Sequence, residues 1–433
     1  RYQKIVQAEP DSSMSEFDWA SAYTTINYCS KVLFNGPRVT EKDPQLSASD
    51  WQQIKAEMVT LRALNYFYLL RAFKDIPYTT KVINKDSEVV IFAPTNQLAV
   101  LDSCIYSIEG NTSNDYAGGV LTAGGKGTAR NRFADKMDSK GLITNSAIYA
   151  ILADMYLWRA SLHEGRWGIN HQDSLGDDPT VHTPKSDYQK AADYADMALA
   201  ALQEQNEVES QNYTNDVDEV WGELAASLAS VASTPNAILI YDDFKKSAGG
   251  STIAMNVAES QFGNGNCRES IFELQINAAN GTENNIVNDL YTYGNNTQLS
   301  VDEGAFSNVF NSKAAGKVDP RKHDTRAWAN ANNKLLTAAP TYLTAPIEKL
   351  QALYCVKYAL PKAIEDKQNG DMAVIYEKTN RSNYSIYRIS DMLLIKAEAL
   401  ACISDNNKTK VQAICNALRR RAFYPQRFTN EQE

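Results

Sequence analysis

The chain has little of what metal centres and nucleic-acid-binding proteins need. It carries four histidines among 433 residues, and its six cysteines are spread widely without a CxxC pair. That distribution disfavours zinc sites and thioredoxin-like chemistry. We expect buried apolar thiols instead, although a bridge between Cys402 and Cys415 stays open. The formal net charge of −9 offers no basic face for phosphate groups, so nucleic acid is not an expected partner.

Long apolar runs are also lacking, since none approaches the roughly 20 residues that a membrane-spanning helix requires. The sequence begins at Arg1 without a methionine, a signal peptide or a lipid-attachment cysteine. We therefore expect a processed product whose targeting segment has been removed.

Catalytic patterns are weak as well. The GGKG at 124–127 lacks the Lys-Ser/Thr ending and the preceding strand of a phosphate-binding loop, and carboxylate pairs in an acidic protein cannot identify a glycosidase. We expect no catalytic residues, no metal, no cofactor and no enzymatic activity. The one metal site worth considering combines histidines and aspartates whose spacing fits no compact ligand motif: His163, His171 and His182 with Asp173, Asp177 or Asp178.

What the chain does have is helical periodicity. Residues 51–77 place apolar side chains at three- and four-residue steps around most of the cylinder, which predicts a buried helix capped by Ser49 or Asp50 and ended by Pro77. Its predicted partner helix is 17–35, ending at Asn35-Gly36-Pro37. Further helices are predicted at 96–108, 144–162, 186–202, 384–403 and 408–422. Paired in this way they are typical of tetratricopeptide-like hairpins.

Two stretches leave this pattern. Residues 78–95 predict an extended excursion, and 205–380 predict turns and loops with a few short strands, such as SIFELQI. The expected fold class is mainly α, a superhelical scaffold of tetratricopeptide-like hairpins with a loop-rich second subdomain. The expected domains are 1–204 (N-terminal hairpins with the 78–95 excursion), 205–380 (ligand-binding subdomain) and 381–433 (a C-terminal hairpin completing the scaffold).

Carbohydrate binding would need flat aromatic faces and polar side chains that read hydroxyl groups, placed on loops rather than inside helices. The stretches 78–92 and 277–342 meet this condition, although packing of an irregular subdomain is the simpler explanation for each single aromatic. The aromatic candidates are Tyr78, Phe92, Tyr291, Tyr293, Trp328 and Tyr342. The polar candidates are Asn295, Asn296, Gln298, Asp324 and Arg326.

Three stretches together resemble the SusD/RagB family of Bacteroidetes outer-membrane lipoproteins. They are EMVTLRALNYFYLLRAFKDIP at 57–77, NSAIYAILADMYLWRA at 145–160 with DYQKAADYADMAL at 187–199, and NYSIYRISDMLLIKAEAL at 383–400 followed by ICNALRRRA. Two departures stand out. Lys74 occupies a position where the family usually has glycine, and the family's usual acidic C-terminal run does not follow Arg427.

The resemblance implies a non-enzymatic, surface-exposed binding protein of the outer membrane, held by a lipid on a cysteine upstream of Arg1. It would lie as a lid on a TonB-dependent, SusC-like transporter and capture glycan for import. Capture of peptide, as in RagB-type members, is the alternative, and glycan hydrolysis is a distant one. The resemblance transfers no binding residue by position and names no particular sugar.

Overall fold

The computed structural model describes most of the helical regions together with several short strands. The described residues are 18–88, 93–110, 119–121, 140–164, 183–210, 266, 269–276, 326–329, 352–355, 360–365, 372–377 and 382–427. The chain divides into two compact units. Unit 1 comprises Arg1–Asp135, Leu142–Asp216 and Asp391–Gln412; unit 2 comprises Lys136–Gly141, Val217–Ser390 and Ala413–Glu433.

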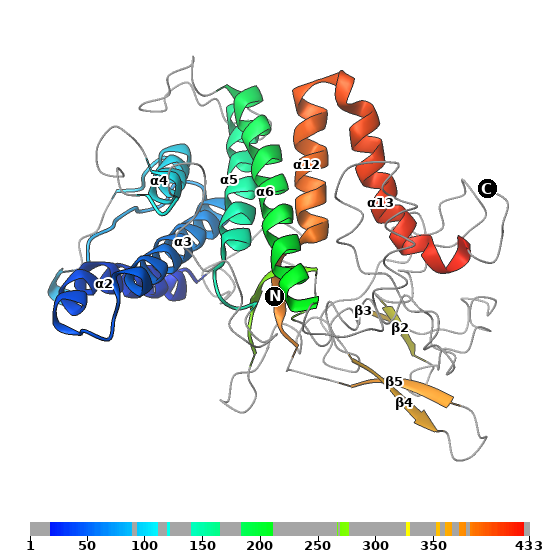
Figure 1. Cartoon of the computed structure of the whole chain (residues 1–433), viewed down its shortest axis with the longest axis horizontal. Helices are drawn as coiled ribbons and strands as arrows, with labels where there is room; N and C mark the ends of the chain where they lie inside the picture. Colours follow the sequence, from blue (N-terminus) through cyan, green and yellow to red (C-terminus); the bar gives the residue numbers. More distant parts are fainter. Residues whose placement is uncertain are drawn as a thin grey trace. The chain divides into compact units, whose positions relative to one another are not determined.

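Helices make up most of the described part of unit 1, which confirms the expected mainly α-helical fold. Figure 1 shows α2 and α3 packed together, α4 beside α3, and α5, α6 and α12 standing side by side. The elements are α2 (Ala20–Lys42), α3 (Ala48–Phe73), the short 3-10 helix η2 (Asp86–Glu88), α4 (Gln97–Glu109), α5 (Asn145–His163), α6 (Pro184–Ser210), α12 (Ile389–Ile403), η10 (Asp405–Asn407) and the start of α13 (Lys408–Arg427).

Helix α3 begins one turn earlier than predicted. The Ser47 hydroxyl accepts a hydrogen bond from the Asp50 amide (3.0 Å), and the Asp50 carboxylate accepts one from the Ser47 amide (3.2 Å), which is a capping box. The helix ends at Phe73, and Lys74 follows with a φ of 64°. Glycine adopts that backbone conformation at little cost and lysine does not, so this turn, where the resemblance leads us to expect glycine, is strained.

Helix α2 runs past its predicted stop at Asn35-Gly36-Pro37 and ends at Lys42. Pro37 has no amide hydrogen for the carbonyl of Leu33, so the local sequence favours an end at this point. Packing outweighs that loss. Gly36 is buried against α3, and a Cβ at this position would lie 1.9 Å from a ring carbon of Trp51. The predicted helix end was therefore wrong because a contact with another helix decides it.

Small residues bring α5 and α6 together, as the predicted hairpin requires. Ala150 and Ala153 on α5 and Ala191 and Ala195 on α6 are all fully buried. Without larger side chains between them, the two helix backbones can approach closely and bury the remaining apolar side chains of both helices.

A buried guanidinium joins three of these helices. Arg159 on α5 is 1% exposed; its Nε lies 2.6 Å from Oδ1 of Asp102 on α4, and its Nη1 lies 2.9 Å from Oδ1 of Asp187 on α6. A buried charge is tolerated only when it is paired. The arginine therefore fixes α4 and α6 relative to α5.

The described part of unit 2 contains three two-stranded antiparallel sheets. They pair β1 (Ser270–Leu274) with β6 (Tyr384–Arg388), β2 (Arg326–Ala329) with β3 (Ala352–Cys355), and β4 (Leu360–Glu365) with β5 (Met372–Glu377). Strand β1 confirms the strand predicted within SIFELQI. Residues 384–388 were predicted as helix, and that prediction was wrong, because pairing with β1 holds them extended and α12 begins only at Ile389.

A polar network supports the β1 and β6 pair. The Glu273 carboxylate is 1% exposed and accepts hydrogen bonds from the Asn266 amide (2.8 Å), the Asn383 side-chain amide (3.0 Å) and the Ser270 hydroxyl. Asn383 in turn accepts a hydrogen bond from the Ile276 amide (2.9 Å). The buried carboxylate is thus satisfied by hydrogen bonds from several segments of the chain.

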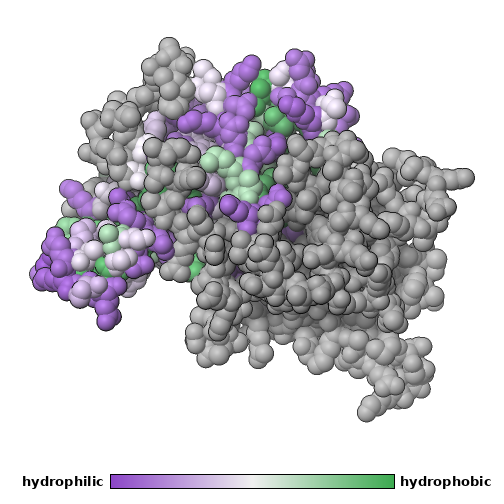
Figure 2. Space-filling view, in the orientation of Figure 1, coloured by the Kyte–Doolittle hydropathy of each residue, from purple (hydrophilic) through white to green (hydrophobic). Residues whose placement is uncertain are grey.

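The described surface on the face drawn in Figure 2 is mostly hydrophilic, with small scattered hydrophobic areas. Exposed large side chains on α2 include Tyr28 (63%) and Phe34 (64%). No described helix is both long and apolar enough to cross a bilayer.

The described cysteines only partly match the expectation of buried thiols. Cys29 and Cys104 are buried, whereas Cys402 is partly accessible and Cys415 is exposed. All four are free, so the bridge considered between Cys402 and Cys415 is not formed.

Candidate functional site

Most of the residues proposed from the sequence fall outside the described part of the chain. These are Phe92, Tyr291, Tyr293, Asn295, Asn296, Gln298, Asp324 and Tyr342. Arg326 and Trp328 lie in strand β2, opposite Cys355 and Leu353 of β3. Their roles in ligand binding stay predictions.

Tyr78 is the candidate whose surroundings are described, and its partly exposed ring packs against α3. The centroid of the ring lies 4.7 Å from that of Tyr66 on α3, with the two planes tilted. The Tyr66 hydroxyl donates to the carbonyl oxygen of Thr79 (2.7 Å) and accepts from the Thr79 amide (3.1 Å). Burial raises the pKa of Tyr66. Tyr78 therefore helps to anchor the start of the 78–88 excursion onto α3.

The excursion is also fixed to α2. The Asn27 side chain donates to the carbonyl oxygen of Ile83 (2.9 Å) and accepts from the Ile83 amide (3.0 Å), so one amide group satisfies both polar groups of that residue. The Tyr23 hydroxyl donates to the carbonyl oxygen of Pro77 (2.7 Å), and burial raises the pKa of Tyr23 to about 12. This extended segment is thus held on the helical layer at its start and near its middle.

Between α2 and the excursion lies a hollow of about 360 Å³, here called the α2 groove. Tyr28 forms part of its lining with an exposed ring, and the Lys31 ammonium lies 5.7 Å from the centroid of that ring. Lys81 and Lys85 line the opposite side, and none of the described lining residues is a carboxylate. The groove therefore combines an aromatic face with hydrogen-bond donors.

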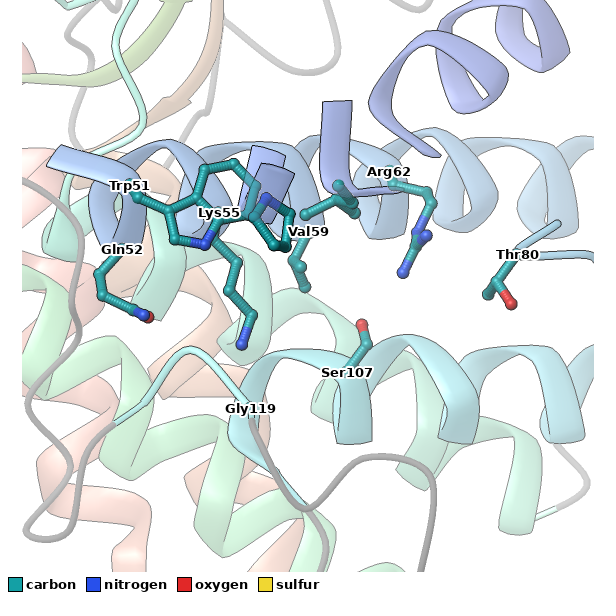
Figure 3. Close-up of a pocket in the computed structure, with 10 residues that line it drawn as sticks. Trp51, Gln52, Lys55, Val59, Arg62, Thr80, Ser107 and Gly119 are labelled. Atoms are coloured by element: carbon teal, nitrogen blue, oxygen red, sulfur yellow. The ribbon is translucent and has the colours of Figure 1, made fainter. Parts of the chain in front are cut away.

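A second hollow of about 490 Å³, here called the α3–α4 hollow, lies between α2, α3 and α4. One stripe of α3 forms its wall, with Trp51, Lys55, Val59 and Arg62 at helical spacing. Figure 3 shows the Lys55 ammonium and the Arg62 guanidinium directed into the space that the Ser107 hydroxyl of α4 faces from the other side. Thr79 lines the α2 groove and Thr80 lines this hollow, so the two lie next to each other along the excursion.

Sequence reasoning missed both hollows because it looked for ligand-binding residues on loops. Tyr28, Trp51, Lys55 and Arg62 all lie on helices whose periodicity was recognised. A signal was present, since Trp51, Lys55 and Arg62 fall on one face of α3 with two cations two turns apart. The prediction of a buried helix gave this face no role in ligand binding.

Comparison with known proteins shows which family the chain resembles. Residues 284–432 match the family model described as the SusD family. This C-terminal stretch of the chain is thus similar to the SusD family. A "SusD-like protein P2" from Formosa agariphila is 22% identical over 166 residues, a match that covers 37% of this chain and 28% of that relative.

Three solved structures share the fold. A SusD homologue from Bacteroides thetaiotaomicron gives a TM-score of 0.53 at 17% identity, over 94% of this chain and 66% of its own. A crystal structure with xylogluco-oligosaccharide gives a TM-score of 0.56 at 15% identity, and the match covers 98% of this chain and 68% of that one. A laminarin-binding SusD-like protein gives a TM-score of 0.52 at 18% identity, and the match covers 96% of this chain and 71% of that one. The chain therefore spans about two thirds of the length of these solved relatives.

Proposed function

We propose that this chain binds an oligosaccharide or polysaccharide at the cell surface, without altering it, for import through a TonB-dependent, SusC-like transporter. The observation that carries the proposal is similarity to the SusD family over residues 284–432, together with a fold shared with a xylogluco-oligosaccharide complex and a laminarin-binding protein. The family resemblance extends the proposal to an outer-membrane location held by a lipid anchor.

The α2 groove gives the proposal a physical basis within unit 1. A sugar ring presents an apolar C–H face and a rim of hydroxyl groups. The Tyr28 ring, 63% exposed, offers a flat apolar surface, while Lys31, Lys81 and Asn84 offer hydrogen-bonding groups around it. Because the two hydrogen bonds between Asn27 and Ile83 already hold the 78–88 excursion in place, little of the groove would need to become ordered on binding.

A glycan array followed by titration calorimetry tests the function. We expect saturable binding to at least one oligosaccharide class and no change in that oligosaccharide after prolonged incubation. Failure to bind any glycan, together with co-purification of peptides, would favour the RagB-type alternative. Release of shorter products would contradict the absence of catalysis.

The groove itself is tested by Tyr28→Ala with Phe34→Ala as its matched control. Both aromatic side chains are exposed to a similar extent on α2, but Phe34 does not line the groove. Loss of a stacking face should cost about 1–2 kcal/mol, or roughly a five- to thirtyfold rise in Kd, for Tyr28→Ala alone. Equal affinity of the two variants would remove the groove from the binding site and leave the family-level function standing.

A further inference from the structure

The α3–α4 hollow concentrates positive charge in a protein whose overall charge is negative. Lys55 and Arg62 are seven residues apart on α3, which places them two turns apart, or about 10 Å along the axis, on the same face. Their side chains are half-buried in the wall of the hollow. No carboxylate is found among the described residues that line it. The described lining of the hollow is thus basic, on a chain with a net charge of −9.

Arg62 is positioned to donate further hydrogen bonds. Its Nη1 makes one long hydrogen bond to the Ser30 hydroxyl oxygen (3.4 Å), and a guanidinium carries five N–H donors. Figure 3 shows the group extending from α3 into the hollow, toward α4. A planar guanidinium in such a setting is well suited to the two oxygens of an acidic group.

The remaining lining suits a sugar rather than a bare ion. The Ser107 hydroxyl donates to the carbonyl oxygen of Cys104 (2.7 Å), which leaves its oxygen able to accept a hydrogen bond from a ligand hydroxyl. Trp51 supplies an indole at one end, fixed by its contact with Gly36. The volume of about 490 Å³ falls within the roughly 300–1,000 Å³ of small-molecule sites.

We propose that the α3–α4 hollow binds an acidic sugar unit of a glycan, one that carries a carboxylate or a sulfate ester. Lys55 and Arg62 contact the acidic group, Ser107 accepts from a hydroxyl, and the sugar ring lies against Trp51. The inference rests on the proposed glycan-binding function and narrows its ligand class. A neutral glycan would leave both cations without a counter-charge from the ligand.

Matched pairs of probes separate charge from ring chemistry. An oligogalacturonate and its methyl ester differ in the carboxylate charge, and a sulfated galactan oligosaccharide and its desulfated form differ in the sulfate ester. Calorimetry with the full chain should show binding of at least one acidic member and at least about tenfold weaker binding of its neutral partner. Binding should also weaken as ionic strength rises from about 0.01 M to about 0.15 M, because the screening length falls from about 30 Å to about 8 Å.

The double variant Lys55→Gln/Arg62→Gln removes two positive charges and keeps polar, though shorter, side chains. Its control, Lys408→Gln/Lys410→Gln, removes the same charge from the exposed start of α13. We expect at least about tenfold loss of affinity for the acidic probe in the first variant and none in the control. Unchanged melting temperatures would show that both variants fold.

Three results would overturn the inference: equal binding of acidic and neutral probes, equal affinity of the two double variants, or binding of neutral glycans alone. The last result leaves the proposed glycan-binding function intact. Absence of binding to every glycan, acidic or neutral, would instead overturn that function together with the inference.

Discussion

Replacing Arg159 with methionine should destabilise unit 1 far more than breaking an exposed ion pair. The guanidinium is 1% exposed and contacts Asp102 at 2.6 Å and Asp187 at 2.9 Å. Methionine fills much of the space but leaves the Asp187 side chain, which is 0% exposed, without this counter-ion. Removing one member of a buried ion pair costs about 3–5 kcal/mol. We expect a loss of that size in the free energy of unfolding near neutral pH.

The loss should depend on pH through Asp187. Burial raises the pKa of Asp187 to about 6, against the lowering effect of Arg159. The folded state therefore holds this proton more tightly than the unfolded chain, so the contribution of Asp187 to stability falls as pH rises from 3.8 to about 6. Without Arg159 the pKa of Asp187 rises further, so the contribution of Asp187 to stability continues to fall at higher pH. The difference in the free energy of unfolding between Arg159→Met and the wild type should thus be smaller at about pH 5 than at about pH 7.

Urea and thermal unfolding followed by circular dichroism at both pH values measure the effect. Lys396→Met is the control, because the Lys396 ammonium lies 2.5 Å from a carboxylate oxygen of Asp196, whose side chain is 53% exposed. An exposed pair of this kind contributes less than about 1 kcal/mol. Equal losses in the two variants, or a loss for Arg159→Met that is the same at both pH values, would refute the reasoning.

Three further substitutions test separate features. Lys74→Gly should raise stability by about 1 kcal/mol by relieving a residue whose φ is 64°, and an unchanged melting temperature would argue against strain at this turn. Gly36→Val should lower stability by about 1–3 kcal/mol because the new side chain would overlap the Trp51 ring, which unfolding and tryptophan fluorescence would report. Trp328→Ala should weaken glycan binding without lowering the melting temperature; an unchanged Kd would remove Trp328 from the site.

The helices of unit 1 could be predicted well where their signals are local. Helix α4 begins after Asn96, whose side chain accepts a hydrogen bond from the Leu98 amide, close to the predicted start. Neither the C-terminal end of α2 nor the extended conformation of residues 384–388 could be predicted, since each depends on a partner distant in the sequence. The contact between Trp51 and Gly36 stabilises α2 beyond Pro37, and pairing with strand β1 holds β6 extended.

Prediction of binding residues was harder because stacking and packing use the same side chains. Tyr78 was chosen as an aromatic in an extended segment, yet its half-buried ring packs against Tyr66 of α3. Tyr28, in a helix, is 63% exposed beside a groove. Solvent exposure distinguishes an aromatic that can bind a ligand from one that packs. Helical periodicity does not reveal that exposure when neighbouring elements cover only part of a helix face.

Unit 1 is assembled from three separate stretches of the chain, the last of which is Asp391–Gln412. During synthesis its first two stretches emerge long before α12, which supplies the buried Met392 and Leu393. Contacts over such sequence distances slow folding because a long loop must close before they form. Unit 1 therefore cannot be completed until residue 412 has left the ribosome, and a fragment ending near Asp216 should expose apolar surface that the finished protein covers.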